Sequence, residues 1–243
     1  MDAERDIASG EEILHAYNAS SSNSELLRTY GFVHPAPSLC TPKIISKIDI
    51  VGACRKAAGE IPKFNKTKGE EDDETWNPED VWNAKESFLL STPIIPPSIQ
   101  VRLESPLSDQ LVTACAIMML NEEGFVDLFL DDDSPALLDM KVVMEEDYLG
   151  TLVAASLLSI CEKAMEEYRT TLKEDEEMLK KGDAGHRMRC AITVRMEEKR
   201  AVVKLKKEAL KALSREEGGG EGNREGEDNT EDAAPSTKRI KLF

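Results

Sequence analysis

Apolar residues that recur at helical spacing between Pro106 and Leu213 constrain the fold more than any other feature of the sequence. Residues three and four positions apart lie on one face of a helix, so this spacing predicts amphipathic helices. The first helix begins after Pro106 and contains six such positions: Leu107, Leu111, Ala114, Cys115, Met118 and Met119. The same spacing predicts helices over 121–130, 145–169 and 186–213, the last being the longest. We therefore predict a mainly α chain, in which the methionine pair fills the core rather than binding a soft metal.

Only short stretches favour β-structure. Apolar and polar residues alternate over 43–50, which predicts a short strand, and Asp49 is a candidate N-cap for a short helix that runs to Lys56. The runs 87–90 and 99–103 flank a proline-rich segment and are predicted to pair as strands. The sequence therefore predicts little β-structure beside the helices.

The chain is acidic, with 47 Asp and Glu against 31 Lys and Arg in 243 residues. Direct binding to nucleic acid needs an excess of basic groups, so this balance argues against it. The charge fits a protein that attracts basic partners, and it fits general solubility at least as well. The polar stretch 63–80 carries the acidic run Glu70–Glu74 and is predicted to be a solvated insertion rather than a substrate contact.

The cysteines and histidines form no recognisable metal-site motif. Five cysteines and three histidines are scattered and no Cys-x-x-Cys pair occurs, which predicts a reduced intracellular protein without a zinc site. Asp131–Asp133 are not followed by the glycine and distal glutamate of an EF-hand, so we expect a solvated turn before Pro135. The apolar runs 111–120 and 149–160 are too short to cross a bilayer, so no membrane segment is predicted.

The composition changes at Ser214. Residues 216–232 are rich in Gly, Glu and Asn and contain no large apolar residue, so they are predicted to be disordered. After Pro235 the chain ends in Ser-Thr-Lys-Arg-Ile-Lys-Leu-Phe. In an extended tail, the cations Lys238, Arg239 and Lys241 match a nuclear localisation signal that binds acidic pockets of an import receptor. The sequence thus predicts a nuclear protein, and a cytoplasmic pool stays open because short basic clusters also arise by chance.

Aromatic residues near the N-terminus follow a distinctive order. Gly10-Glu11-Glu12 precedes Tyr17, and the segment 22–27, Ser-Asn-Ser-Glu-Leu-Leu, precedes Tyr30-Gly31-Phe32. Aromatic rings form apolar walls, and a tyrosine hydroxyl orients an amine or accepts a CH···O contact from a polarised methyl group. Aromatic faces also attract a sulfonium by about 0.5–2 kcal/mol. Taken alone, Tyr30 and Phe32 are better explained as core aromatics after a short helix.

Together these motifs resemble the closing segment of a SET domain, in the version of the Rubisco large-subunit and ribosomal-protein group of protein-lysine methyltransferases. The resemblance implies that Tyr17 is the catalytic tyrosine. It also implies that Tyr30 and Phe32 line the lysine channel and pack against the cofactor, S-adenosylmethionine. Asn18 stands where the family usually has glycine or aspartate, a mild change because Asn tolerates left-handed backbone. The expected partner is a protein substrate with a basic, lysine-containing segment.

Three later segments resemble the helical substrate-binding domain of the same group. They are 108–125, 168–176 (Tyr-Arg-Thr-Thr-Leu-Lys-Glu-Asp-Glu) and 195–200 (Arg-Met-Glu-Glu-Lys-Arg). The resemblance implies three parts, namely a small β-rich SET-domain remnant at 1–34, a helical substrate-binding domain at 35–213 and a disordered acidic tail at 214–243.

Two elements of the family's cofactor site do not occur in the sequence. These are the Asn-His dipeptide, which holds the adenine and carboxylate ends of the cofactor, and the Gly-rich cofactor turn. We therefore expect a C-terminal part of the enzyme, inactive alone and with weak or absent cofactor binding. An incomplete gene model and a genuine truncated protein both stay open. The alternatives are a stand-alone, non-catalytic protein-binding module and a structural scaffold. The acceptor residue also stays open, because family members on this fold modify residues other than lysine.

Overall fold

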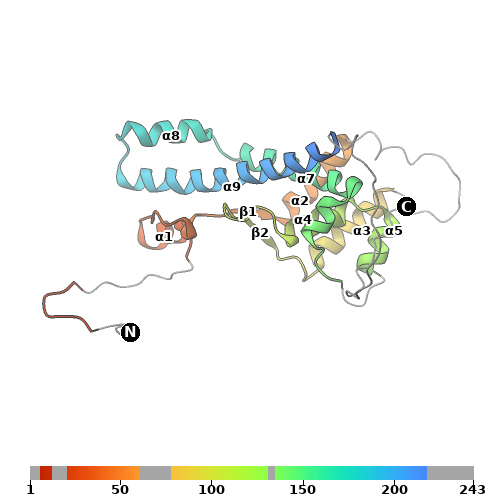
Figure 1. The fold of residues 1–243 in the computed structure, drawn as a ribbon, viewed down its shortest axis with the longest axis horizontal. Helices are drawn as coiled ribbons and strands as arrows, with labels where there is room; N and C mark the ends of the chain where they lie inside the picture. Colours follow the sequence, from red (N-terminus) through yellow and green to blue (C-terminus); the bar gives the residue numbers. More distant parts are fainter. Residues whose placement is uncertain (1–5, 13–20, 61–77, 131–134, 218–243) are drawn as a thin grey trace, which may run out of the picture.

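The computed structural model describes residues 6–12, 21–60, 78–130 and 135–217, and it confirms the prediction of a mainly α chain (Figure 1). In these residues the elements are α1 (Asn23–Tyr30), a 3₁₀ turn (Pro37–Leu39), β1 (Lys43–Ser46), α2 (Lys47–Glu60), α3 (Pro78–Ser91), β2 (Ser98–Val101), α4 (Asp109–Met119), α5 (Glu122–Phe125), a π-helical turn (Val126–Leu130), α6 (Met140–Glu145), α7 (Asp147–Glu166), α8 (Leu172–Lys181) and α9 (His186–Glu217).

The core is built around α4, which is apolar on nearly every side. All its residues from Leu111 to Met119 are buried, and α4 packs against α2, α3 and α7 (Figure 1). The helix α7 in turn packs against α2 and α9. A helix that is apolar all round belongs in the interior of a domain. Five of the six predicted core positions are therefore confirmed, including the methionine pair, whereas Leu107 precedes the helix and is only partly buried.

The helix predicted at 145–169 is confirmed as α7, Asp147–Glu166, which is longer than the apolar run 149–160 that was judged too short to cross a bilayer. The stretch Tyr148–Glu166 is long and apolar enough, by length and composition alone, to cross a membrane, and 61% of it is buried inside the molecule. Leu152, Val153 and Leu157 are at most 2% exposed within the core. The apolar character of α7 is thus accounted for by packing against its neighbouring helices.

The predicted strand at 43–50 is confirmed only in its first half. β1 pairs antiparallel with β2, with Lys43 opposite Val101 and Ser46 opposite Ser98. The chain then enters α2, because Ser46 and Asp49 form a reciprocal cap. The Ser46 hydroxyl accepts from the Asp49 N–H at 3.1 Å, and the Asp49 carboxylate accepts from the Ser46 N–H at 3.3 Å. The prediction of Asp49 as N-cap is therefore wrong by three residues, since Ser46 holds that position.

The prediction of a strand at 87–90 is wrong, because this segment lies in the last turns of α3. Leu89 is fully buried and Lys85, one helical turn earlier, is 3% exposed, so the two occupy one inward face of the helix. A short apolar run does not distinguish a strand from the end of a helix. The strand predicted at 99–103 exists as β2, and its partner is β1 rather than its neighbour in sequence.

Like α3, the helices α6 and α8 were not predicted from the sequence. The N-cap of α6 is Asp139, whose carboxylate accepts from the N–H groups of Lys141 and Val142. The N-cap of α8 is Thr171, which forms a capping box with Glu174, and its C-cap is Gly182, which has φ of +74°. The two helices have only six and ten residues, so capping residues mark them more clearly than apolar periodicity does.

The longest predicted helix is confirmed as α9, which continues to Glu217, four residues past its predicted end. Ser214 therefore belongs to a helix and not to the tail. The predicted polar insertion at 63–80 overlaps the described residues only at Pro78–Asp80, the first turn of α3. The predicted turn at 131–133 and the tail from 218 onward lie outside the described residues.

Lys85 of α3 is a buried cation at the C-terminal end of α4. Its Nζ donates to the carbonyl of Leu120, which is the C-cap of α4, and lies 5.9 Å from the ring centroid of Trp82 and 6.0 Å from that of Phe125. Burial lowers the pKa of Lys85 to about 8. The ammonium of Lys85 interacts favourably with the carbonyl end of α4, but burial removes the water that would stabilise its charge. The contribution of Lys85 to stability therefore depends on pH.

We predict that the advantage of the wild type over Lys85→Met in free energy of unfolding grows by about 2 kcal/mol between pH 7.5 and pH 10. The folded pKa is depressed, so the unfolded chain binds more protons than the folded one between about pH 8 and the ordinary lysine pKa of about 10.4, and stability rises with pH there. Urea unfolding of both proteins at the two pH values measures this difference. A difference that stays constant with pH would show that the buried ammonium does not titrate in the folded state.

Candidate functional site

The aromatic pair singled out in the sequence lies at the end of α1. Ser22 caps the helix, since its N–H donates to the Glu25 carboxylate at 2.8 Å. Gly31 ends it at φ of +81°, where its N–H donates to the carbonyls of Leu26 and Leu27. That left-handed conformation suits glycine and lets the chain turn between two aromatic residues.

Tyr30 and Phe32 lie on the two sides of this turn, and their rings form a tilted pair. Their ring centroids are 6.1 Å apart, and Tyr30 is 50% exposed while Phe32 is half-buried. Neither residue is part of the main core, so the interpretation as ordinary core aromatics does not hold for Tyr30. Tyr17 and the tail cations Lys238, Arg239 and Lys241 lie outside the described residues. Of residues 1–34, the described ones contain α1 and a turn at Ser9–Gly10.

Asn23, the first residue of α1, is fully buried and joins both ends of the aromatic segment. Its Oδ1 accepts from the N–H of His34 at 2.7 Å, and its Nδ2 donates to the carbonyl of His34 at 2.9 Å. The same Nδ2 donates to the carboxylate of Glu197 on α9 at 2.7 Å. A single buried amide therefore ties residues 23 and 34 together and to a helix more than 160 positions later in the sequence.

Glu197 receives a second hydrogen bond from the same part of the chain. Its other carboxylate oxygen accepts from the Thr41 N–H at 2.8 Å, and the Thr41 hydroxyl accepts from the Ser24 N–H at 3.0 Å. Burial, followed by the charge of Glu197, raises the pKa of Cys40. The thiol beside Glu197 is thus kept neutral, which excludes it as a thiolate nucleophile at neutral pH.

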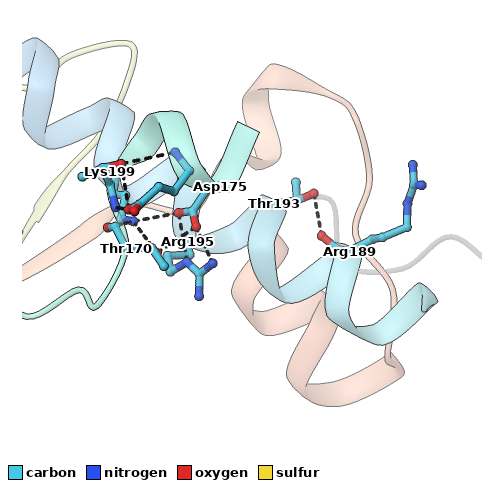
Figure 2. A network of polar contacts seen from close by, with 8 residues as sticks. Thr170, Asp175, Arg189, Thr193, Arg195 and Lys199 are labelled. Carbon is cyan, nitrogen blue, oxygen red and sulfur yellow. Dashed lines mark hydrogen bonds and ion pairs between the residues drawn. The ribbon is translucent and has the colours of Figure 1, made fainter. Parts of the chain in front are cut away.

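On the opposite side of α9, Asp175 of α8 is enclosed by two cations (Figure 2). The fully buried Asp175 accepts from Lys199 Nζ at 2.7 Å, from Arg195 Nε at 3.0 Å and from the Thr170 hydroxyl at 2.8 Å. Burial favours a raised pKa for Asp175, but the hydrogen bonds from Arg195, Lys199 and Thr170 outweigh it and hold the pKa below its ordinary value. Asp175 is therefore an ionised, fully satisfied carboxylate.

Tyr168 completes this network at the start of the α7–α8 connection. Its hydroxyl donates to the Glu198 carboxylate at 2.7 Å, and the ammonium groups of Lys43 and Lys199 each lie 5.0 Å from its ring centroid. Burial, with the neighbouring Glu198, raises the pKa of Tyr168, so the phenol stays protonated. Lys43 also forms an ion pair with Glu167. These contacts fix β1 and the start of α8 on the same stretch of α9.

The structure thus brings together three motifs that lie far apart in the sequence, at 22–32, 168–176 and 195–200. Arg195 and Lys199 are one helical turn apart and both bind Asp175, whereas Glu197, midway between them, points to the other side of α9. Asn23 and Glu197 lie within motifs that resemble the family's, but the sequence analysis assigned neither a role. Glu197 stands next to the apolar position Met196 of the predicted helix 186–213, and a charged residue beside the buried face of a helix could have indicated a buried partner.

Across residues 6–12, 21–60, 78–130 and 135–217, no group of three or more His, Cys, Asp or Glu side chains could hold a metal ion. Cys54, Cys115 and Cys161 are buried, and burial raises the pKa of Cys161 to about 12. The described residues thus hold the aromatic pair Tyr30 and Phe32 at a fixed place against the helical domain.

Comparison with known proteins agrees with this arrangement. A family model described as the Rubisco LSMT substrate-binding domain matches residues 79–202, just over half of the chain. A solved structure described as "Structure of Rubisco LSMT bound to AdoMet" superposes with a TM-score of 0.53 at 19% sequence identity. The superposition covers 84% of this chain and 42% of that one, so the chain spans less than half of the solved protein. At this identity the likeness shows a shared fold.

No curated protein matches the chain in sequence. The matched range begins in α3 and ends in α9, and it contains the central helices together with Asp175, Arg195, Glu197 and Lys199. The resemblance to the Rubisco large-subunit methyltransferase group, which rested on short motifs, is therefore confirmed for this domain. The chain belongs to the family of proteins that carry the Rubisco LSMT substrate-binding domain.

Proposed function

We propose that this chain is the substrate-recognition part of an S-adenosylmethionine-dependent protein-lysine methyltransferase of the SET type. The family match gives the domain that would bind the protein substrate, and the solved structure with a similar fold is a methyltransferase bound to that cofactor. The N-terminal residues 1–34 would be the closing segment of the SET domain. The protein substrate would present a lysine within a basic segment, to which a chain of net charge −16 is electrostatically suited.

One observation carries the proposal. The segment that bears Tyr30 and Phe32 is joined to α9 of the substrate-binding domain through Asn23 and Glu197, at 2.7 Å. The residues that the resemblance assigns to the lysine channel are therefore held beside the domain that would recognise the protein around that lysine.

The chemistry explains why aromatic residues are needed there. Methyl transfer is an in-line displacement at a sulfonium carbon, so the lysine amine has to arrive neutral, aligned and free of water. Tyr17 would orient the amine, and Tyr30 and Phe32 would form walls of the channel. The half-exposed ring of Tyr30 beside Phe32 fits such a wall. S-adenosylmethionine supplies the methyl group when bound, and no Asn-His dipeptide for its adenine and carboxylate ends is found among the 243 residues.

The test is a fusion of the chain to the N-terminal half of a SET domain of the same group. We expect the fused protein to transfer labelled methyl groups from S-adenosylmethionine to lysine in nuclear or ribosomal proteins, and the unfused chain to transfer none. Mass spectrometry of the labelled product identifies the acceptor residue. A folded fusion that binds the cofactor but methylates nothing would favour the alternative function, a non-catalytic protein-binding module.

For the cofactor, we predict no measurable binding of S-adenosylmethionine to the 243-residue chain. The aromatic pair alone would supply about 0.5–2 kcal/mol of attraction to the sulfonium, far less than a stable complex requires. Isothermal titration calorimetry measures this directly, with the fused protein as the positive control. A micromolar dissociation constant for the unfused chain, about −8 kcal/mol, would show that a complete cofactor site is present in it.

For the tail, we predict that replacing Lys238, Arg239 and Lys241 together by alanine moves a fluorescently tagged protein from the nucleus to the cytoplasm. The tag has to be large, because a chain of 27.0 kDa enters the nucleus by diffusion. The free energy of unfolding should change by less than about 0.5 kcal/mol, as for surface changes away from packed features. Unchanged nuclear enrichment of the large tagged protein would assign import to another segment.

A further inference from the structure

We infer that Glu197 is a positioning residue, which holds the aromatic pair Tyr30 and Phe32 in register with the substrate-binding helices. For its effect on methyl transfer this role rests on the proposed function. The structural part of the role, the attachment of residues 23–41 to α9, stands on the hydrogen bonds themselves.

The first step is that residues 23–34 form a closed unit. The side-chain amide of Asn23 makes two hydrogen bonds to the backbone of His34, one to its N–H and one to its carbonyl. Residues Tyr30 and Phe32 lie inside this unit, just after α1 ends at Gly31. An amide that bonds both backbone groups of one residue fixes its position and orientation, because each bond restricts a different direction.

The second step is that Glu197 attaches this unit to α9 at two points. One carboxylate oxygen accepts from Asn23 Nδ2 at 2.7 Å and the other from the Thr41 N–H at 2.8 Å. Thr41 also accepts from the Ser24 N–H, so both attachment points are connected to the start of α1. Glu197 is 7% exposed and Asn23 is fully buried, so water does not readily replace either partner.

The apolar contact at this end of the molecule is separate from the main core. Leu26 is 3% exposed, and on α9 Ile192 and Met196 are at most 4% exposed, yet none of the three belongs to the main core cluster. The helix α1 contacts α9 here (Figure 1). Apolar contacts have no preferred direction, so the two charge-assisted hydrogen bonds to Glu197 supply the directional part of the register between the aromatic pair and the helical domain.

Glutamine at position 197 would break the register without changing the shape of the side chain. Its amide offers one acceptor and one donor, whereas Asn23 Nδ2 and the Thr41 N–H are both donors. One donor would then face the glutamine NH₂ group. The adjacent Glu198→Gln is a matched control, because Glu198 binds the hydroxyl of Tyr168 instead.

The first measurement is backbone amide hydrogen exchange of the full 243-residue chain, which needs no catalysis. In Glu197→Gln we expect exchange at His34 and Thr41 to be at least tenfold faster, while amides in α4 and α7 keep their protection. In Glu198→Gln, exchange at His34 and Thr41 should stay as in the wild type. Equal exchange at His34 and Thr41 in wild type and Glu197→Gln would overturn the inference.

A second variant protects the test against general unfolding. Asn23→Ala removes the other half of the link, so it should speed exchange at Thr41 as Glu197→Gln does. Because Asn23 and Glu197 are hydrogen-bonded to each other, the effects of the two changes on exchange at Thr41 should combine to less than their product. If the two effects instead multiply, Asn23 and Glu197 act independently and the proposed link is absent.

In the fused enzyme, the kinetics of Glu197→Gln distinguish a positioning role of Glu197 from a purely stabilising one. We expect Glu197→Gln to lower kcat for the protein substrate between tenfold and a hundredfold, since a small misplacement of channel residues is costly. The KM for S-adenosylmethionine should change less, because the aromatic pair supplies only about 0.5–2 kcal/mol of attraction to the cofactor. A kcat equal to that of the wild type, in a fusion that is active, would overturn the positioning role. A fusion without any activity would instead count against the proposed function, and the exchange result would still decide whether Glu197 holds the segment.

Discussion

Replacing Asp175 by alanine is expected to lower the free energy of unfolding by about 3–5 kcal/mol. Asp175 is fully buried, and it is the carboxylate that neutralises the equally buried Lys199. Removing one partner of such a pair leaves an uncompensated charge in the interior, which costs far more than the intact pair contributes. Urea denaturation followed by circular dichroism measures the change.

The neighbouring Glu176 provides the control. Its carboxylate forms an ion pair with Arg200 at 3.2 Å on the surface, where both side chains are more than a third exposed. Surface pairs contribute about 0–1 kcal/mol, so Glu176→Ala should change stability very little. Equal losses for Asp175→Ala and Glu176→Ala would mean that the network between α8 and α9 is solvated rather than buried.

The second large effect concerns Tyr17. In the fused enzyme we expect Tyr17→Phe to lower kcat by about a hundredfold while the KM for the protein substrate changes much less. The loss follows because the hydroxyl would orient the amine mainly in the transition state, and such interactions appear in kcat. Steady-state methyl transfer with varied protein substrate separates the two constants.

Tyr148→Phe is the matched control for that experiment. Tyr148 lies at the start of α7 and is 41% exposed, and its hydroxyl has no proposed part in the reaction. Its variant should keep full turnover. If Tyr17→Phe also keeps full turnover, Tyr17 has a structural role and the one implied by the resemblance is wrong.

The helical part of the fold was predictable because its signals are local. The period of apolar residues identified α4, α7 and α9, and their buried faces match it. The segment 87–90 was misassigned for the same reason, since four residues such as Ser-Phe-Leu-Leu fit either period. Short capped helices such as α8 depend on Thr171 and Gly182, whose effect is confined to the helix ends.

The candidate site was predictable in its parts but not in its assembly. The motifs at 22–32, 168–176 and 195–200 were recognised one by one, yet nothing in a sequence states that Asn23 bonds Glu197. Such contacts depend on how α1 and α9 cross, which side-chain packing decides. The same holds for Lys199, whose buried charge is tolerated only because Asp175 and Thr170 come from a different helix and turn.

We propose that this chain recognises the protein substrate of a methyltransferase, and a competition experiment tests this proposal most directly. Excess 243-residue chain, added to the fused enzyme, should sequester the protein substrate and raise its apparent KM without lowering kcat. The apparent KM for S-adenosylmethionine should stay the same. An unrelated protein of the same net charge, used at equal concentration, controls for simple attraction between an acidic chain and a basic substrate. Competition by the chain and not by the control is the predicted result, and methyl transfer unaffected by any excess of the chain would contradict the claim.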